Sequence, residues 1–368
     1  MQEKLSLRKD IRGFQDELAF AISKEYQESN GFRDSKINLE GYDNIKTKIP
    51  SFTKEYAEFL AIENDEIVCT NNEIGEKKSN WLKELSVEVY INNVPKEWRN
   101  TIEDITEDGV PIPKGFTYLT GTKNTGVVIK DGIGNEFVWV PATVDNYVRD
   151  YSFPRTDENT GDTTYSNNLL CDGTLPSGIA DETVDVKKYG GFYIARYEAG
   201  TPDGTIDTKL DIEGIPLSQK NKVVWTNIGF SNLNKSAEKM ISNEYVQTGL
   251  LTGRSWDRTC HWLAECGYNI ENSSSYGNYL ESIQPANVSG YGIKQVAGYS
   301  DYWCANNIYD FAGNVWEFTS EMYSTLYHNV RGGSFSNNMY RPIIFRGRAN
   351  DEETGTDHRG FRIRLYIK

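Results

Sequence analysis

Hydrophobic side chains near the start of the chain recur at the spacing of an α-helix. Successive members are four, three, four and four residues apart, at Leu7, Ile11, Phe14, Leu18 and Ile22. This period places them along one stripe, so we predict an amphipathic helix of about twenty residues. The stripe fits either packing within its own domain or a short heptad seam in an oligomer, because it spans too few heptads to separate the two.

The pattern is less regular between this helix and residue 108. We expect further helical pieces at 51–62 and 80–85, and a short strand at 87–91, where apolar and polar residues alternate. No cluster of nucleophiles or metal ligands stands out here. This region is therefore predicted to be a platform that anchors or oligomerises the chain.

From residue 109 onward the pattern changes to short apolar and aromatic runs separated by Gly, Asn and Asp. Such runs are typical of strands joined by turns, and they lie at 115–121, 126–131, 136–142, 190–200 and 222–228. One helix is predicted at 252–266, because Trp256, Cys260 and Leu263 share one face. The stretch 269–301 has no clear period, and we expect an irregular loop there.

Glycine marks the boundary between these two regions. Residues 1–108 contain four of the 32 glycines, and the sequence DGVPIPKGF at 108–116 is typical of an extended linker punctuated by proline. We therefore predict two domains: an N-terminal anchoring and oligomerisation region at 1–108, and a second domain at 109–368.

Charge and composition narrow the class of partner. The formal charge of −14 disfavours nucleic acid, whose phosphates would be repelled. The start of the chain has no apolar signal segment and no later stretch resembles a membrane span, so we expect a protein made in a bacterial cytoplasm. The arginines gathered in the last forty residues favour structural ion pairs over an anion site.

Cysteine and histidine are sparse. Five cysteines without a CxxC pair argue against a disulfide framework and a structural zinc site, so we expect buried thiols. The three histidines are far apart in the sequence. A multi-histidine metal centre is therefore not expected.

Four short motifs follow one another at the end of the chain: NIYDFAGNVWEF, VRGGSF, FRGRAND and GFRIRL, between Asn307 and Leu365. In this order they resemble the closing segment of the formylglycine-generating enzyme (sulfatase-modifying factor) family, a branch of the C-type-lectin-like fold. The resemblance extends over about residues 111–368 and includes GFYIARYEAG and the helix at 252–266. It implies an α+β fold, with a loop-rich C-type-lectin-like domain after a smaller, mainly helical N-terminal region.

The resemblance also implies a calcium ion in the YDFAGNVWE turn. Carried over by position, the ligands would be the carboxylates of Asp310 and Glu317 and the carbonyl oxygens of Gly313 and Val315. Oxygen ligands on a glycine-kinked turn suit this hard cation. The alternative is a metal-free turn in which both carboxylates accept hydrogen bonds.

Enzymes of this family need a pair of cysteines after the RGGS turn. Residues 335–342 contain no thiol, and the two cysteine positions fall at about Asn337 and Pro342. Neither side chain can form a thiolate or bind a soft metal. We therefore predict that the protein is not an enzyme, and a cysteine-dependent oxidase is the least favoured function.

Side chains between the framework motifs suggest binding instead. Tyr, Asn and Arg are typical of adaptable recognition surfaces, because they combine rigid aromatic area with versatile hydrogen bonding. The predicted ligand-binding residues are Tyr323, Tyr327, Phe335, Asn337, Asn338, Tyr340, Arg341 and Asn350. The alternative is that they are ordinary polar loop residues.

A helical platform followed by a non-catalytic lectin-like domain resembles the receptor-binding proteins of phages and prophages, including targets of diversity-generating retroelements. The resemblance implies a tail- or baseplate-associated adhesin of the virion, homo-oligomeric and trimeric in some relatives. Its C-terminal domain would bind a host-surface protein or glycan, and its N-terminal region other virion proteins. Asn and Tyr are too sparse after RGGS to require a diversified region. A structural virion subunit without a host ligand is the alternative.

Overall fold

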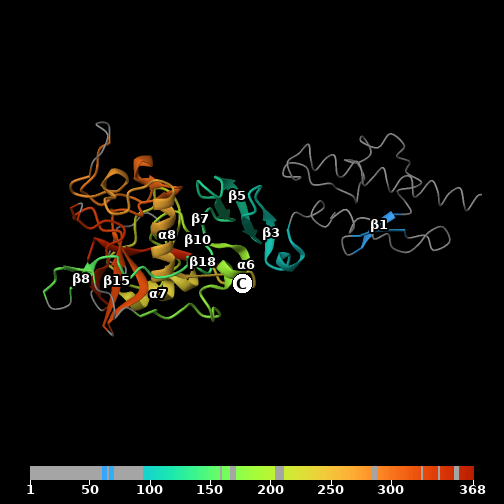
Figure 1. Ribbon diagram of the computed structural model, residues 1–368, viewed down its shortest axis with the longest axis horizontal. Helices are drawn as coiled ribbons and strands as arrows, with labels where there is room; N and C mark the ends of the chain where they lie inside the picture. Colours follow the sequence, from blue (N-terminus) through green and yellow to red (C-terminus); the bar gives the residue numbers. More distant parts are fainter. Residues whose placement is uncertain are drawn as a thin grey trace, which may run out of the picture. The chain divides into compact units, whose positions relative to one another are not determined.

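The computed structural model describes residues 60–63, 66–69, 94–157, 160–165, 171–203, 211–282, 288–324, 326–338, 340–351 and 356–368. The chain divides into two compact units, Met1–Glu107 and Asp108–Lys368 (Figure 1). The amphipathic helix predicted around Leu7 to Ile22, the helix predicted at 80–85 and the strand predicted at 87–91 lie outside the described residues. The assignment of an anchoring role to residues 1–108 stays a prediction.

In the first unit, β1 (Leu60–Glu63) pairs with β2 (Glu66–Cys69) in an antiparallel hairpin. The helix predicted at 51–62 is therefore wrong over its last three residues. Ile62 faces Ile67 across this pair, and β-branched residues favour such a pleated arrangement over a helix. The unit also contains η1 (Lys96–Trp98) and β3 (Ile102–Ile105).

The second unit is built around a six-stranded antiparallel sheet in the order β11-β18-β10-β7-β6-β5. Its strands are β5 (Phe116–Thr120), β6 (Val128–Asp131), β7 (Glu136–Pro141), β10 (Gly191–Ala195), β11 (Val246–Leu250) and β18 (Ile363–Ile367). Four of the five predicted strands are present as β5, β6, β7 and β10. Every residue of β10 is buried, as expected for a central strand covered on both faces.

The fifth predicted strand, at 222–228, is not one. Within it only Val224 forms an isolated bridge, to Gly200, and Asn221 and Asn227 have positive φ angles of 65° and 61°. A left-handed backbone conformation at each end turns the chain before it can form the hydrogen-bond ladder of a strand. Asparagine is one of the few residues other than glycine that adopts this conformation readily.

A second sheet holds the closing motifs, in the order β16-β15-β14-β17. Its strands are β14 (Trp316–Ser324), β15 (Tyr327–Arg331), β16 (Gly347–Asn350) and β17 (Arg359–Phe361), and β14 runs parallel to β17. Shorter pieces are β4 (Pro111–Pro113), β8 (Arg155–Thr156), β9 (Thr163–Thr164), β12 (Cys304–Ala305) and β13 (Ile308–Tyr309).

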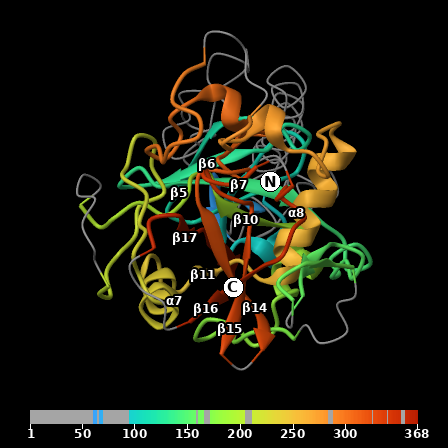
Figure 2. The same ribbon diagram turned by 90° about the vertical axis from the view of Figure 1, so that its left-hand side faces the viewer.

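The described residues contain three α-helices: α6 (Val184–Tyr189), α7 (Phe230–Lys239) and α8 (Gly253–Glu265). The helix predicted at 252–266 is confirmed as α8, which Thr252 begins with a capping box to Ser255. Trp256, Cys260 and Leu263 are buried on it as predicted. Helix α8 packs on β7 and β14 while α7 packs on β11, and Figure 2 shows them on either side of β14.

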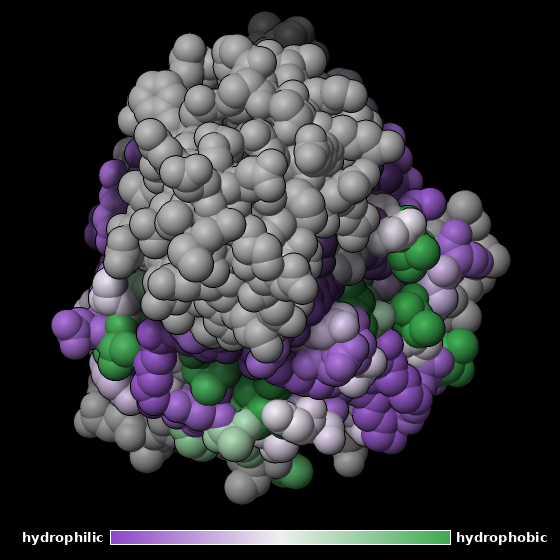
Figure 3. All heavy atoms as spheres, turned by 90° about the vertical axis from the view of Figure 1, so that its right-hand side faces the viewer, coloured by the Kyte–Doolittle hydropathy of each residue, from purple (hydrophilic) through white to green (hydrophobic). Residues whose placement is uncertain are grey.

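The fold is α+β with more strand than helix in the described part, as the sequence predicted. No helix of that part combines the length and hydropathy needed to span a bilayer. On the face seen in Figure 3, hydrophobic residues stand in small groups among hydrophilic ones.

Candidate functional site

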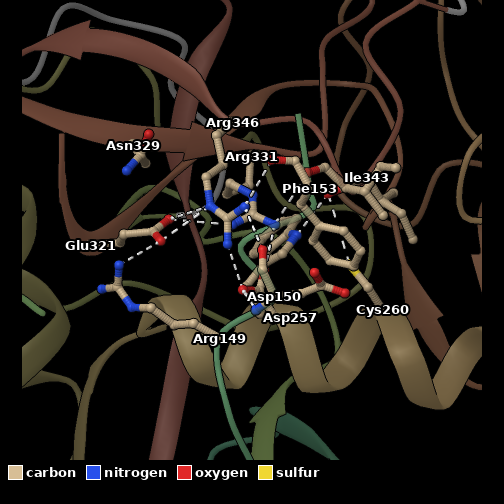
Figure 4. A network of polar contacts seen from close by, with 12 residues as sticks. Arg149, Asp150, Phe153, Asp257, Cys260, Glu321, Asn329, Arg331, Ile343 and Arg346 are labelled. Atoms are coloured by element: carbon tan, nitrogen blue, oxygen red, sulfur yellow. Dashed lines mark hydrogen bonds and ion pairs between the residues drawn. The ribbon is translucent and has the colours of Figure 1, made fainter. Parts of the chain in front are cut away.

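The turn that follows β15 rests on a buried network of arginines and carboxylates (Figure 4). Asp257 of α8 accepts hydrogen bonds from Arg331 Nη2 at 2.8 Å and from Arg346 Nη2 at 2.5 Å. Glu321 of β14 accepts one from Arg346 Nε at 3.1 Å and pairs with Arg149 Nη1 at 3.0 Å. The two carboxylates thereby hold three guanidinium groups and join α8 to both ends of the RGGS-containing segment.

Electrostatics within this network favour the charged carboxylate. Burial alone would raise the pKa of Glu321, but Arg346, Arg331 and Arg149 together hold it below its usual value. Arg346 Nη1 also donates to the carbonyl oxygens of Asp150 at 3.0 Å and Phe153 at 3.3 Å. The prediction that these arginines serve in ion pairs and bonds to loop carbonyls is confirmed for Arg331 and Arg346.

A second buried charge cluster lies at the YDFAGNVWE turn. Both oxygens of Glu317 accept from Arg362, at 2.9 Å from Nε and 2.6 Å from Nη2. Asp310 Oδ2 accepts from the Gly298 N–H at 2.7 Å, whereas Asp310 Oδ1 has no hydrogen-bond partner in the described part. Glu198 accepts from Asn314 Nδ2 at 2.5 Å.

This cluster gathers three buried carboxylates around the guanidinium of Arg362. Burial raises the pKa of Asp310 to about 7, and the nearby carboxylate of Glu317 adds to the rise. Burial, followed by repulsion from Asp310 and Glu317, also raises the pKa of Glu198 well above its usual value. The site therefore favours a proton or an added cation.

The calcium ligands expected from the sequence fit this cluster in part. The unpartnered Asp310 Oδ1 and the surplus of carboxylates suit a hard cation. Glu317 would have to share its oxygens with Arg362. Since no three acidic, histidine or cysteine side chains of the described part form a metal-binding group, the Gly313 and Val315 carbonyls would be needed as further ligands.

Glycine is required at position 313 in this turn. Gly313 has a φ of +75°, and a Cβ atom there would lie 2.2 Å from the Asn278 carbonyl oxygen. Both the backbone angle and the close approach exclude other residues. The kink of this turn therefore depends on glycine at this position.

The residues that the resemblance places at about the family's cysteine positions have structural roles here. Asn337 Oδ1 accepts from the Ser334 N–H at 3.0 Å and from its hydroxyl at 2.9 Å, and Pro342 is buried. Beneath this segment the Cys260 thiol lies 3.8 Å from the Ile343 carbonyl oxygen. Burial raises the pKa of Cys260 far above its usual value, so this thiol stays protonated and unreactive.

Five of the predicted ligand-binding residues lie on the turn at 335–341. Tyr340 is 71% exposed, and Phe335, Asn337 and Asn338 are half-buried. The Arg341 guanidinium stacks on Phe345 at 4.2 Å, so its planar face is held in place. The turn thus presents an exposed aromatic ring beside a positioned guanidinium.

The other three predicted residues lie elsewhere. Tyr327 and Asn350 are cross-strand partners at the far end of β15, about 13 Å along the strand from Arg331, where the RGGS turn begins. Tyr323 is only 2% exposed, and its hydroxyl donates to the Thr156 carbonyl oxygen at 2.8 Å. The expectation that Tyr323 lies on the surface is therefore wrong, because it packs inward from β14 against Arg155.

Sequence reasoning missed part of the surface beside this turn. The Leu280 N–H donates to the Asn337 carbonyl oxygen at 2.9 Å, which joins the 269–301 loop to the turn. Gly292 lies against Leu280, and the exposed fractions of Leu280, Tyr291 and Ile293 are 55%, 45% and 58%. The unusual aromatic content of this aperiodic loop was the available signal. We call Leu280, Tyr291, Ile293 and Tyr340, with the 335–341 turn, the display surface.

Comparisons with known proteins agree with the closing motifs. Residues 241–365 match the family model of the sulfatase-modifying factor enzyme 1-like domain. No curated protein matches the chain.

Three solved structures are similar to this chain at low identity. PvdO from Pseudomonas aeruginosa has 14% identity and a TM-score of 0.36, over 67% of this chain and 99% of that one. Variable protein 1 of Treponema denticola has 12% sequence identity and a TM-score of 0.37, and the match covers 68% of this chain and 98% of that one. CarF has 13% sequence identity and a TM-score of 0.32, and the match covers 54% of this chain and 96% of that one.

The family match runs from the residues before β11 through α8 and the second sheet into β18. It contains all four closing motifs, the buried network around Asp257 and Glu321, and the turn with Asp310. Residues 241–365 therefore contain a sulfatase-modifying factor enzyme 1-like domain of the C-type-lectin-like fold.

Proposed function

We propose that the C-terminal domain binds a ligand through the display surface and carries out no chemistry there. The observation that carries this proposal is that residues 335–342, where the resemblance places the two catalytic cysteines, contain no cysteine and include a tyrosine that is 71% exposed. Exposed aromatic and aliphatic side chains gathered at one place are typical of interaction sites. The buried arginine network below holds the turn without using the exposed residues.

The partner we propose is a host-surface protein or glycan, and the protein an adhesin of a phage or prophage tail or baseplate. Support comes from the order of the predicted regions, with a platform before a display domain. On this proposal the chain is made in a bacterial cytoplasm, assembles into the virion as a homo-oligomer, and contacts other virion proteins through its N-terminal region.

Substitution of the two most prominent residues of the turn tests the binding role. Tyr340→Ala or Arg341→Ala should weaken saturable binding to host cells, or to a spot on a glycan array, by about 1–3 kcal/mol if either residue is a central anchor. Tyr118→Ala is the matched control, since Tyr118 is 45% exposed on the edge strand β5 of the other sheet.

Two outcomes would contradict the proposal. Absence of saturable binding to any cell or glycan would favour the structural virion subunit. Conversion of the cysteine in a sulfatase-type peptide to formylglycine would show that the domain is an enzyme.

We also propose that the turn at Asp310 binds calcium. Calcium should raise the thermal midpoint, and excess chelator should lower it, because a cation that binds only the folded state stabilises it. Asp310→Asn should abolish this response, while Asp301→Asn should keep it, since the side chain of Asp301 is 76% exposed and pairs with Lys220. A wild-type midpoint that is the same in calcium and in chelator would eliminate the ion.

A further inference from the structure

A small polar pocket of about 220 Å³ opens beside the N-terminus of α8, apart from the display surface. Gly173 forms one wall by lying directly on β14, where a Cβ atom would be 1.6 Å from the Ser320 carbonyl oxygen. The neighbouring bridge between Cys171 and Met322 extends this contact along the strand. The polar lining consists of Asp172, Asp181, Glu182, Thr252, Arg254 and Ser320.

One hydroxyl of the lining makes no hydrogen bond within the described part of the protein. Ser320 is only 4% exposed, and no hydrogen bond joins its Oγ to any described residue, although its backbone N–H donates to Leu251. Thr252 Oγ1, in contrast, already accepts from the Ser255 N–H at 3.1 Å. A hydroxyl of the lining that makes no bond within the protein keeps its hydrogen-bonding capacity for a molecule in the pocket.

The carboxylates of the lining are each paired with a cation. Asp172 lies 2.7 Å from Arg149 Nη2 and 3.2 Å from Arg254 Nη2. Asp181 lies 2.7 Å from Lys187 Nζ, and Glu182 lies 3.0 Å from Arg254 Nη1. Because these charges are balanced locally, the pocket favours a neutral ligand over an anion or a cation.

The remaining hydrogen-bonding capacity suits hydroxyl groups. Each carboxylate oxygen accepts more than one hydrogen bond, a guanidinium donates in a fixed fork, and a serine hydroxyl does both. Neighbouring hydroxyls of a polyol also donate and accept, so they match carboxylates and a guanidinium placed side by side. The volume is below the roughly 300–1,000 Å³ of pockets that hold drug-sized molecules. One ring-sized unit is the largest ligand expected.

We propose that this pocket binds a single neutral polyhydroxylated unit, either a free monosaccharide or the terminal residue of a glycan. The pocket shares no residue with the display surface. The site is therefore additional to the proposed ligand-binding role and does not depend on it.

The test is titration of the full chain with free glucose, galactose, mannose and N-acetylglucosamine, followed by ligand-observed NMR. At least one sugar should bind saturably. Ser320→Ala should weaken that binding about two- to tenfold, as expected for one neutral hydrogen bond. Glu182→Gln should weaken it by about ten- to a hundredfold, because the bond to a charged acceptor is stronger.

Controls test the specificity of the substitutions and separate the two sources of sugar. Tyr118→Ala, at an exposed residue outside the pocket lining, should leave sugar binding unchanged, and a glycan array then shows whether the same sugar is recognised at a chain end. Ser320→Ala removes one hydroxyl that makes no bond within the protein, so its thermal midpoint should match the wild type even if Glu182→Gln is less stable. The proposal is overturned if no sugar binds, if Ser320→Ala binds as tightly as the wild type, or if putrescine or inorganic phosphate binds there instead.

Discussion

Replacing Glu321 with alanine should bring the C-terminal domain close to unfolding. Glu321 lies wholly inside the domain and pairs with Arg149, Arg331 and Arg346. Its removal leaves buried guanidinium groups short of a counter-charge, and breaking a buried pair in this way costs about 3–5 kcal/mol. Domains are stable by only about 5–15 kcal/mol in total. Urea denaturation followed by tryptophan fluorescence measures the loss.

A matched control is an acidic residue whose ion pairs are exposed. Glu213 pairs with Lys235 and Lys239 at the surface, and Glu213→Ala should shift the urea midpoint only slightly, because water and salt screen such pairs. If Glu321→Ala is no more destabilising than Glu213→Ala, the buried network does not hold the fold together.

The second large effect concerns pH. In chelator, the free energy of unfolding should fall as pH rises from about 4 to about 7, because the folded pKa of Asp310 is about 7 and the ordinary pKa of this carboxyl is 3.8. Between these values the native state keeps a proton that the unfolded chain releases, so stability declines with pH. The ceiling is about 4 kcal/mol at 1.36 kcal/mol per pKa unit. Asp310→Asn should make this decline smaller and be the more stable protein above neutral pH. A remainder is expected from Glu198, because its pKa is raised as well.

An acid of opposite behaviour provides the control for this experiment. The pKa of Asp301 is lowered by its hydrogen bonds from Lys220 and Tyr309, so its contribution is lost as pH falls, not as it rises. Asp301→Asn should therefore leave the decline between about pH 4 and 7 in place. A wild-type stability that stays level or increases across that window would mean that Asp310 remains ionised in the folded protein.

Local sequence signals predicted the helix and strands whose formation depends on capping, apolar periodicity and the conformational preferences of neighbouring residues. Helix α8 has a capping threonine and a regular apolar face, and both survive unchanged in the fold. Strands β5, β6, β7 and β10 are runs rich in β-branched and aromatic residues bounded by turn formers. In contrast, α7 was missed because its sequence FSNLNKSAEK is mostly polar and buries only Leu233, Ser236 and Ala237.

The charge networks depend on partners far away in the sequence, which pattern alone does not pair. Asp257 belongs to the polar positions of α8, yet it is buried by bonds to Arg331 and Arg346, which lie 74 and 89 residues further along the chain. Glu198 likewise lies close enough to Asp310 for the two carboxylates to repel each other, although they are far apart in the sequence.

Only part of the display surface was predicted, because its other part is also brought close by contacts between residues far apart in the sequence. The RGGS motif located the turn at 335–341, but Leu280 reaches that turn only through its backbone bond to Asn337. Such contacts of an aperiodic loop leave no trace in residue spacing. Tyr323 shows the opposite error, since a polar aromatic residue beside displayed positions was assigned outward and packs inward.

The anchoring of the RGGS turn from beneath has a practical consequence for protein engineering. Arg331 and Arg346 fasten both ends of the segment to Asp257 on α8, while Tyr340 in its middle is free of the core. Randomised libraries at positions 336, 338 and 340 should therefore retain expression yield and melting behaviour close to those of the parent. The domain would then serve as a scaffold for selecting new binders, in the manner of an antibody framework carrying interchangeable loops.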